Sequence, residues 1–361
     1  MLIDRRRDHS IRIPRPDLSA TLGAPNACGN CHVNRTPQWA ADYVAKWYGG
    51  ARIGFQQFGP ALQAGRLGAP GAQRALAELM SNPGQPAIAR ATALAMLAAF
   101  NEVSNVSLDR NSQDASPLVR RAAAEALSTV APAASASTML RLLNDPVRAV
   151  RIEAAVSLDE GATRGSLPDD VTHVLDHDSA EYLSTQTFNT DRPEGHLNLG
   201  LFFAKKGMFA RAETELKTAL SIDPSFSPAA VNLADLDREL GRDDEAEVVL
   251  RRALLHTPDD ASLLYALGLL NVRKKRTARA LDLFAAAARL DPSNPRYAYV
   301  YAIALNDAGD TKAAINILEG SIRLHPYDRD SLAALVSFCD RTGDQAKARR
   351  YTRVLDELTT N

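Results

Sequence analysis

Residues 193–226 read PEGHLNLGLFFAKKGMFARAETELKTALSIDPSF, and the next 34 residues, 227–260, read SPAAVNLADLDRELGRDDEAEVVLRRALLHTPDD. The two stretches carry small and apolar residues at matching places and a proline near the end. A fixed period of this length indicates a stack of similar structural units rather than one globular core. The two prolines, Pro224 and Pro258, are 34 residues apart, and the same spacing continues downstream to Pro292 and Pro326.

Each copy has the features of a tetratricopeptide repeat (TPR), which is a pair of packed helices. Small residues let the two helices approach closely, and a turn glycine allows the positive φ with which the chain leaves the first helix. Proline stops the second helix because it has no N–H to donate. The third copy departs from the pattern only at the turn, where Lys275 replaces glycine. Four full repeats begin at Pro193, Ser227, Ala261 and Pro295, and a partial fifth runs from Arg329 to Asn361.

A stack of TPRs curves, and the first helices of the repeats line its concave face. The resemblance to TPR proteins implies which positions face that groove, and Tyr265 and Tyr299 occupy the same such position in adjacent repeats. Tyrosine and arginine are frequent at the energetic centres of protein interfaces. The alternative is that these residues are ordinary solvated or inter-repeat positions. The implied partner-binding residues are Lys205, Arg238, Tyr265, Arg273, Arg296 and Tyr299.

A second, looser repeat lies upstream. Arg90, Arg120 and Arg151 are each followed seven residues later by leucine and preceded by a breaker that contains proline. The segments DASPLVRRAAAEAL and DPVRAVRIEAAVSL resemble HEAT-type repeats, in which such a turn starts a helix. We therefore expect helical hairpins over residues 70–160. Residues 161–178 contain glycine, proline and acidic residues, which predicts a linker. We expect a short helix near 180–188 to cap the TPR array, so that the linker and the capping helix together occupy residues 161–192.

Composition supports an all-α protein. Alanine and leucine dominate the apolar residues, and only 6% of residues are aromatic. The 42 Lys and Arg nearly cancel the 43 Asp and Glu, so the net charge of -1 points neither to nucleic acid nor to an acidic membrane surface. No apolar run approaches the roughly 20 residues that cross a bilayer, and the first residues, MLIDRRRDHS, lack the apolar region of a signal peptide. By itself this indicates a cytosolic protein. The lone Cys339 reads as a small buried apolar residue.

The N-terminal part contains Cys28-Gly29-Asn30-Cys31-His32, which matches C-x-x-C-H, the attachment sequence of c-type haem. Two thiols three positions apart can reach the two vinyl groups of one porphyrin, and the adjacent imidazole can then bind the iron. A zinc site would need further ligands, and the nearest pair, His173 and His177, is far along the chain. A thioredoxin-like dithiol and a structural disulfide are further alternatives.

The second axial ligand is open. His9 is the best candidate, either for this haem or for another. Met80 is conceivable but reads as a core residue of a repeat helix. Trp39, Tyr43 and Trp47 recur every four residues and form one helix face, which could cover the porphyrin or pack onto the first hairpin. The arginines before residue 16 would suit haem propionates, although such a run is more often solvated.

The stretch RDHSIRIPRPDLSATLGAPNACGNCHVNRTPQWAADYVAKWYGG, followed by HEAT-like and TPR repeats, resembles the C-terminal part of multihaem c-type cytochromes that carry TPRs. The resemblance implies a haem-binding segment over residues 1–60 that holds one covalent haem c. Members of that family have further haem motifs and are exported. This chain has one motif and no signal, which suggests a fragment or an internal start.

The predicted fold is an all-α solenoid, HEAT-like hairpins followed by a TPR superhelix, preceded by the short haem segment. The predicted function is electron transfer by an exported, for example periplasmic, haem protein, with the solenoid holding a protein or peptide in its groove near a redox partner protein. No catalytic constellation appears, so an enzyme is not expected. The alternative is a scaffold for protein–protein interaction in which no haem is attached to the C-x-x-C-H motif.

Overall fold

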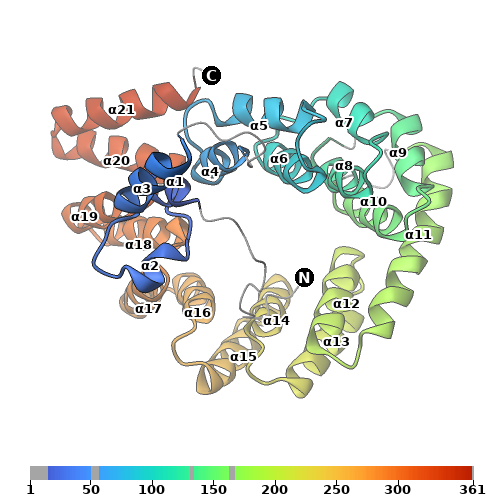
Figure 1. Ribbon diagram of the computed structural model, residues 1–361. Helices are drawn as coiled ribbons and strands as arrows, with labels where there is room; N and C mark the ends of the chain where they lie inside the picture. Colours follow the sequence, from blue (N-terminus) through green and yellow to red (C-terminus); the bar gives the residue numbers. More distant parts are fainter. Residues whose placement is uncertain (1–14, 50–56, 131–133, 162–166, 360–361) are drawn as a thin grey trace. The chain divides into compact units, whose positions relative to one another are not determined.

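A computed structural model describes residues 15–49, 57–130, 134–161 and 167–359 of the chain. Every regular element in these residues is a helix, which confirms the all-α prediction. The chain divides into two compact units, residues 1–64 and residues 65–361. Figure 1 labels the helices of both units, which we describe separately.

The N-terminal unit contains α1 (Pro16–Leu22), the single turn α2 (Cys28–Cys31) and α3 (Pro37–Tyr48). The longest of them, α3, starts at Pro37, whose fixed φ suits a first helical position. The preceding Thr36 caps the helix, because its hydroxyl accepts a hydrogen bond from the Trp39 N–H. Helices α1 and α3 pack against each other, so α3 has a buried side and an exposed side. A further helix, α4 (Gly59–Leu67), runs across the division between the two units.

The second unit begins with helical hairpins where the sequence predicts them. Along this stretch α6 packs on α5 and α8, and α8 packs in turn on α10, so the longer helices form a continuous row. The type of repeat stays a prediction. The helices are α5 (Ala72–Ser81), α6 (Ala87–Ala99), α7 (Asn105–Asn111), α8 (Pro117–Val130), α9 (Ala136–Leu143) and α10 (Arg148–Gly161).

The three arginines of the looser repeat form a ladder of ion pairs between successive hairpins. Arg90 binds Asp114, and Arg120 binds Asp145 at 2.6 Å. Arg151 continues the ladder with Glu181 at 2.8 Å. Asp114 and Asp145 are the breaker residues that precede the next helix, so Arg90 and Arg120 each tie their own helix to the turn of the following hairpin. Arg151 instead binds a residue within α11.

The predicted linker over 161–178 differs from the structure, because α11 (Asp169–Phe188) begins at Asp169 and is 20 residues long. Val171 and Leu175 recur at helical spacing and are both fully buried. Acidic residues in the first turn, Asp169 and Asp170, also favour a helix start. Burial of one apolar face against α9 and α10 therefore outweighs the acidic composition that suggested a linker.

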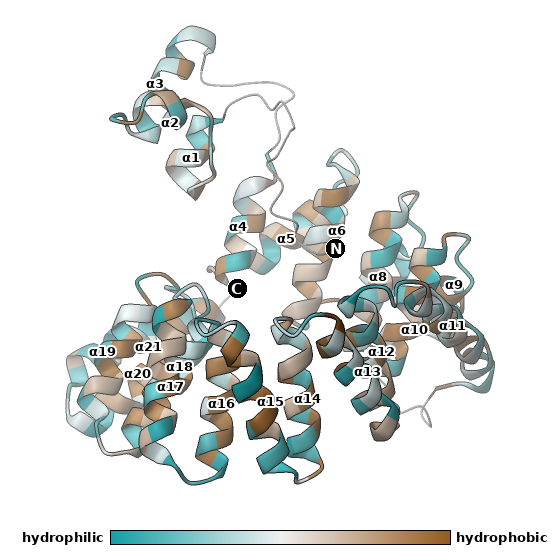
Figure 2. Ribbon diagram, turned by 90° about the horizontal axis from the view of Figure 1, so that it is seen from below, coloured by the Kyte–Doolittle hydropathy of each residue, from teal (hydrophilic) through white to brown (hydrophobic). Residues whose placement is uncertain are grey.

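The TPR region consists of paired helices whose first members begin at the five predicted repeat starts. Leu199, Leu233 and Leu267, at the predicted large apolar position of the first three repeats, are buried at 5% exposure or less. Cys339 lies in the core of the last repeat, as predicted. In Figure 2, hydrophilic and hydrophobic residues both occur along helices such as α14 to α16. The pairs are α12 (Pro193–Lys205) with α13 (Phe209–Ile222), α14 (Ser227–Glu239) with α15 (Asp243–His256), α16 (Ala261–Arg273) with α17 (Thr277–Leu290), α18 (Pro295–Asp307) with α19 (Thr311–Ser321), and α20 (Arg329–Thr342) with α21 (Gln345–Thr359).

The turn of the third repeat carries a residue that is poorly suited to its backbone. Lys275 has φ +57°, where Gly241 and Gly309 of the neighbouring repeats have +74° and +93°. A side chain in this left-handed region costs roughly 1 kcal/mol relative to glycine. We therefore expect Lys275→Gly to raise the free energy of unfolding by about 0.5–1 kcal/mol in urea denaturation. Gly241→Lys is the reverse control and should lower it. A loss of stability in Lys275→Gly would contradict the assignment of strain to this turn.

Candidate docking groove and haem segment

A pocket of about 300 Å³ opens along the first helices of the second, third and fourth repeats. Three of the six residues predicted to face the groove line it: Arg238 from α14, Tyr265 from α16 and Arg296 from α18. Each comes from a different repeat, so the pocket exists only because the repeats stack. The floor is apolar, and Leu269, on the same helix as Tyr265, keeps 41% of its surface exposed there.

Tyr265 stands at the centre of an aromatic group in this pocket. Its ring lies 5.0 Å from that of Tyr297 and 5.9 Å from that of the buried Phe284, measured between centroids. The Tyr265 side chain also interacts with the guanidinium of Arg296 and raises its pKa. Arg296 in turn lies 5.4 Å above the ring of Tyr299. Tyr265 is therefore held by packing against Phe284 and Tyr297 and by its interaction with the Arg296 guanidinium.

The other three predicted residues do not line this pocket. Tyr299 is partly buried against the core of the last repeats. Arg273 is exposed at the end of α16, where its Nε lies 2.8 Å from both carboxylate oxygens of Asp243. Lys205 is exposed at the end of α12. The structure thus brings together half of the predicted set.

Sequence reasoning missed Tyr297 and Asp235, which also line the pocket. Tyr297 is buried at 8% exposure and occupies a position at which the other four repeats have smaller side chains. An aromatic residue that replaces smaller ones at one place in a repeat would have been a usable signal. The residues at this position in the other repeats are Gly195, Ala229, Leu263 and Ser331.

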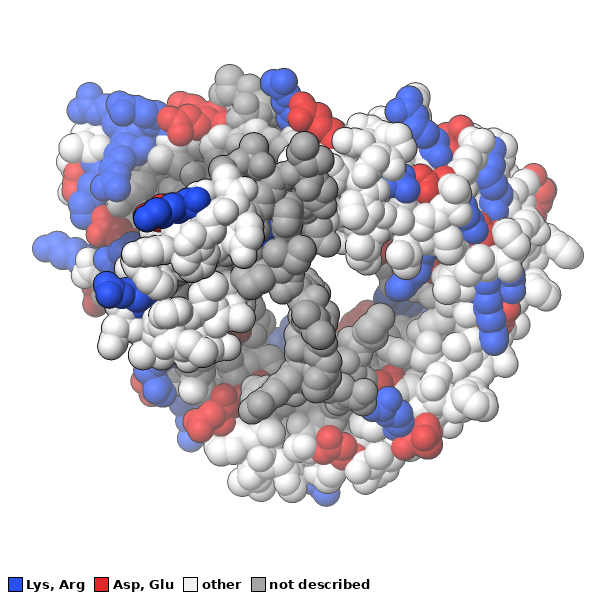
Figure 3. Space-filling view, viewed as in Figure 1, with Lys and Arg blue, Asp and Glu red and all other residues white. Residues whose placement is uncertain are grey.

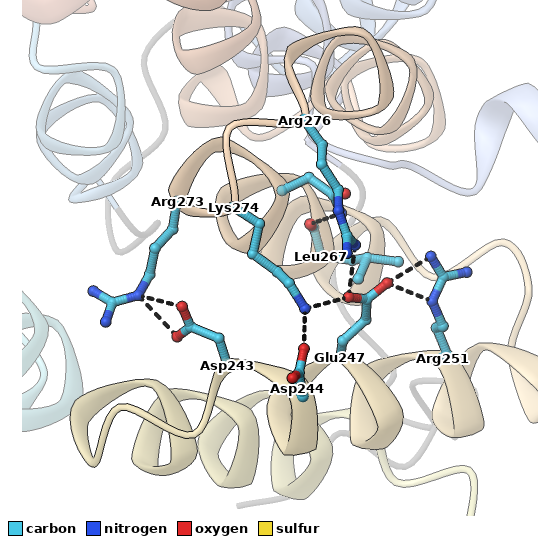
Figure 4. A network of polar contacts seen from close by, with 9 residues as sticks. Asp243, Asp244, Glu247, Arg251, Leu267, Arg273, Lys274 and Arg276 are labelled. Carbon is cyan, nitrogen blue, oxygen red and sulfur yellow. Dashed lines mark hydrogen bonds and ion pairs between the residues drawn. The ribbon is translucent and has the colours of Figure 1, made fainter.

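A network of charged side chains joins the second and third repeats (Figure 4). Glu247 on α15 accepts hydrogen bonds from Lys274 at 2.7 Å, Arg276 at 2.8 Å and Arg251 at 2.8 Å. The hydrogen bond from Lys274, with those from the two arginines, lowers the pKa of Glu247 to about 2 against the effect of burial. Lys274 also binds Asp244 at 2.5 Å. Because Lys274 and Arg276 flank the left-handed Lys275, the network ties this turn to α15.

Charge is otherwise mixed over the surface. In the space-filling view of Figure 3, basic and acidic side chains are interspersed over most of the visible face. This agrees with the formal net charge of -1. Large fields of one sign, which would steer a polyanion, are not expected from such a distribution.

In the N-terminal unit, the single turn α2 carries both thiols of the C-x-x-C-H motif. Cys28 and Cys31 are free thiols, and both Cys31 and His32 are exposed. Asn26 holds the start of the turn, because its Oδ1 accepts a hydrogen bond from the Cys28 N–H at 2.9 Å. The Nδ2 of Asn26 donates to Ser19 Oγ of α1 at 2.6 Å, so the motif is tied to α1.

Next to His32 lies the aromatic face that the sequence predicts on α3. The ring centroids of His32 and Trp39 are 4.9 Å apart, those of Trp39 and Tyr43 are 4.9 Å apart, and those of Tyr43 and Trp47 are 5.6 Å apart. Within this row the exposure reaches 41% at Tyr43 and 65% at Trp47. An open aromatic face therefore begins beside the imidazole of the motif.

The remaining ligand candidates are placed as follows. His9 lies outside the described residues. Met80 is buried at 7% exposure, and its sulfur lies 3.6 Å from the Asn111 Nδ2, as a core residue would be. His173 and His177 are exposed on α11. Within the described residues, no three His, Cys, Asp or Glu side chains are grouped as a metal site.

Two segments of the chain, residues 203–270 and 283–329, match family models described as tetratricopeptide repeat. This confirms the TPRs in the second half of the chain, and TPR proteins bind protein partners. Among the helices of the described residues, none has the length and apolar character needed to cross a membrane.

Several solved structures are similar in part. MamA is 21% identical, with 44% of this chain and 94% of that chain covered and a TM-score of 0.39. PilF of Pseudomonas aeruginosa is 22% identical, with 46% and 75% covered and a TM-score of 0.41. MamA of Desulfovibrio magneticus is 20% identical, with 42% and 88% covered and a TM-score of 0.35. Among curated proteins, no relative matches the chain.

Proposed function

We propose that the chain is a docking scaffold that holds a segment of a protein partner in the concave groove of its TPR array. The observation that carries this proposal is the pocket between α14, α16 and α18, where Arg238, Tyr265 and Arg296 converge from three repeats. Tyrosine and arginine supply much of the energy at interfaces, because a ring buries a large area with little loss of entropy and a guanidinium offers five donors. The charged network between the second and third repeats supports the angle at which these helices meet.

Selection of a random peptide library on the folded full chain tests this function. We expect enriched peptides whose affinity falls at least tenfold in Tyr265→Ala, since truncation at an interface centre costs about 2 kcal/mol or more. Val248→Ala, at a side chain of α15 that is 66% exposed and does not line the pocket, is the matched control and should bind normally. Thermal unfolding of both variants separates lost binding from lost fold. Peptides that bind Tyr265→Ala as well as the original chain would place the docking surface elsewhere.

We also propose that the N-terminal unit carries one covalent haem c at Cys28 and Cys31, with His32 as an axial ligand. The residues fit such a group, because both thiols are free on one turn, the imidazole is exposed, and an open aromatic face adjoins it. His9 is the proposed second axial ligand, to this haem or to another. When bound, haem would supply one-electron transfer. The resemblance to multihaem cytochromes supports the same reading, and it implies an exported protein with a redox partner near the solenoid.

The haem proposal predicts a change in mass. After secretion from a host that attaches haem c, the intact chain should be heavier by one haem, whereas Cys28→Ala with Cys31→Ala should have the bare mass. Because α2 is one exposed turn, the double variant should keep the helical circular dichroism of the original chain. Cys339→Ala, at a buried thiol of the last repeat, should still carry the group. A bare mass for the original chain would refute the haem proposal and leave the docking scaffold intact.

A further inference from the structure

We infer that the pocket between α14, α16 and α18 receives a bulky apolar side chain of the partner, and that an acidic side chain of the same segment binds Arg238 or Arg296 at its rim. The inference rests on the proposed docking function and names the chemistry of the partner. It therefore commits to one occupant, an extended peptide segment in which a large apolar residue lies close to Asp or Glu.

The shape of the pocket calls for an apolar side chain. Ala234 and Ala266 contribute only methyl groups to the lining, and Leu250 and Leu270 beneath them are almost fully buried. The resulting space of about 300 Å³ exceeds the roughly 150 Å³ of an apolar cavity that accepts benzene. Water in such a space finds few polar partners, so its displacement by an apolar group favours binding.

The rim of the pocket calls for an anion. Its charged side chains are Arg238, Arg296 and Asp235, which leaves an excess of one positive charge. Asp235 lies 3.3 Å from Arg238, and both remain about half exposed. The acid nearest to Arg296 is Asp330, at 3.7 Å, and the Arg296 side chain is 56% exposed. Asp235 and Asp330 leave guanidinium N–H groups of Arg238 and Arg296 exposed, and a carboxylate of the partner accepts charge-assisted hydrogen bonds from these groups.

Nearby cations do not compete for that anion. Arg273 faces both carboxylate oxygens of Asp243 through its Nε, and Lys274 and Arg276 bind Glu247. These groups are held in the network of Figure 4, on the side of α16 where the turn to α17 lies. Arg238 and Arg296 are therefore the two cations that the pocket presents to a ligand.

The peptides selected from the random library test this chemistry. We expect the enriched sequences to share Phe, Trp, Leu or Met within a few residues of Asp or Glu. A synthetic copy with acetylated and amidated ends, which removes terminal charges, should bind at least fivefold more weakly when its acid is replaced by alanine. Binding should also weaken as salt rises from low to physiological concentration, because the ion pair is exposed.

A charge exchange gives the decisive comparison. Arg238→Glu with Arg296→Glu should lose at least tenfold in affinity for the acidic peptide and recover when the peptide carries lysine in place of its acid. Arg238→Gln with Arg296→Gln removes the charges without adding repulsion of Asp235, and it should show the loss without the recovery. Arg252→Glu, an exposed arginine on α15 outside the pocket, is the matched control.

The outcomes separate the two proposals. Enriched peptides that need Tyr265 but contain no acid, or that ignore the charge exchange, would overturn this inference and leave the docking function standing. Peptides that prefer lysine in the original chain would overturn it as well. A library that yields no binding peptide would count against the docking function and the inference together.

Discussion

Replacing Arg120 by methionine is expected to lower the free energy of unfolding by about 3 kcal/mol, because it leaves a buried carboxylate without its partner. Asp145 is only 4% exposed and binds Arg120 through two hydrogen bonds, at 2.6 and 3.1 Å. Arg120 also donates to the carbonyl oxygen of Asp114 at 2.9 Å, so one side chain joins two turns. Methionine keeps the apolar stem but supplies none of these donors.

The neighbouring residue provides the control. Arg121 is 55% exposed and makes one hydrogen bond, at 2.9 Å, with Glu153. An exposed pair of this kind contributes less than about 1 kcal/mol, so Arg121→Met should change the stability little. Urea denaturation of the two variants, followed by circular dichroism, compares the same substitution at adjacent positions. Equal effects would show that the ladder of ion pairs contributes no more than ordinary surface charges.

The effect of Arg120→Met should depend on pH. Burial alone would raise the pKa of Asp145, but the hydrogen bonds from Arg120 and the Val147 N–H outweigh it and lower the pKa below its ordinary 3.8. A carboxylate with a lowered pKa contributes stability above its unfolded pKa, and this contribution is lost as pH falls through the folded value. The difference between the original chain and Arg120→Met should therefore be full at neutral pH and shrink in acid.

Gly268→Ala is expected to lower the free energy of unfolding by about 2–3 kcal/mol, because the new methyl group has no room. A Cβ at this position would lie 2.5 Å from Cε1 and 2.7 Å from Cδ1 of Phe284. The ring of Phe284 is 1% exposed and contacts Tyr265, so it cannot move without shifting the wall of the pocket. Selected peptides should therefore bind this variant more weakly as well.

Gly320→Ala is the matched control in a helix without such crowding. The nearest atom to a Cβ there is the end of the flexible Arg323 side chain, at 3.7 Å. Alanine favours a helix interior over glycine by roughly 0.5–1 kcal/mol. Because Gly320 lies in the last turn of α19, this variant should gain stability by less than that amount. Calorimetric unfolding of both variants should give shifts of opposite sign. A neutral Gly268→Ala would mean that the third repeat is packed more loosely than the contact with Phe284 indicates.

Local rules account for what could be predicted. Pro224, Pro258 and Pro292 each stand two residues after the end of a helix, because proline cannot donate a backbone hydrogen bond, and that constraint acts wherever the residue stands. Glycine at the turns and small residues inside each pair are required by backbone geometry and by close approach of helices. The sequence therefore predicts the repeat starts, the small residue at Gly268 and the aromatic row on α3. The same holds for the C-x-x-C-H motif, which is defined by residue spacing alone.

Contacts between distant residues decided the rest. Composition suggested a linker at residues 169–178, but burial of Val171 and Leu175 against neighbouring helices makes that stretch part of α11. The repeat pattern marked Arg120, and Asp145 as a breaker, without pairing them, since an ion pair across 25 positions needs the packed hairpins. Likewise, six groove residues were predicted, yet only the angle between successive repeats determines that Arg238, Tyr265 and Arg296 share one pocket. Sequence determines where the first helix of each TPR begins because those causes are local, whereas the extent of α11 and the partners of a side chain follow from how the helices stack.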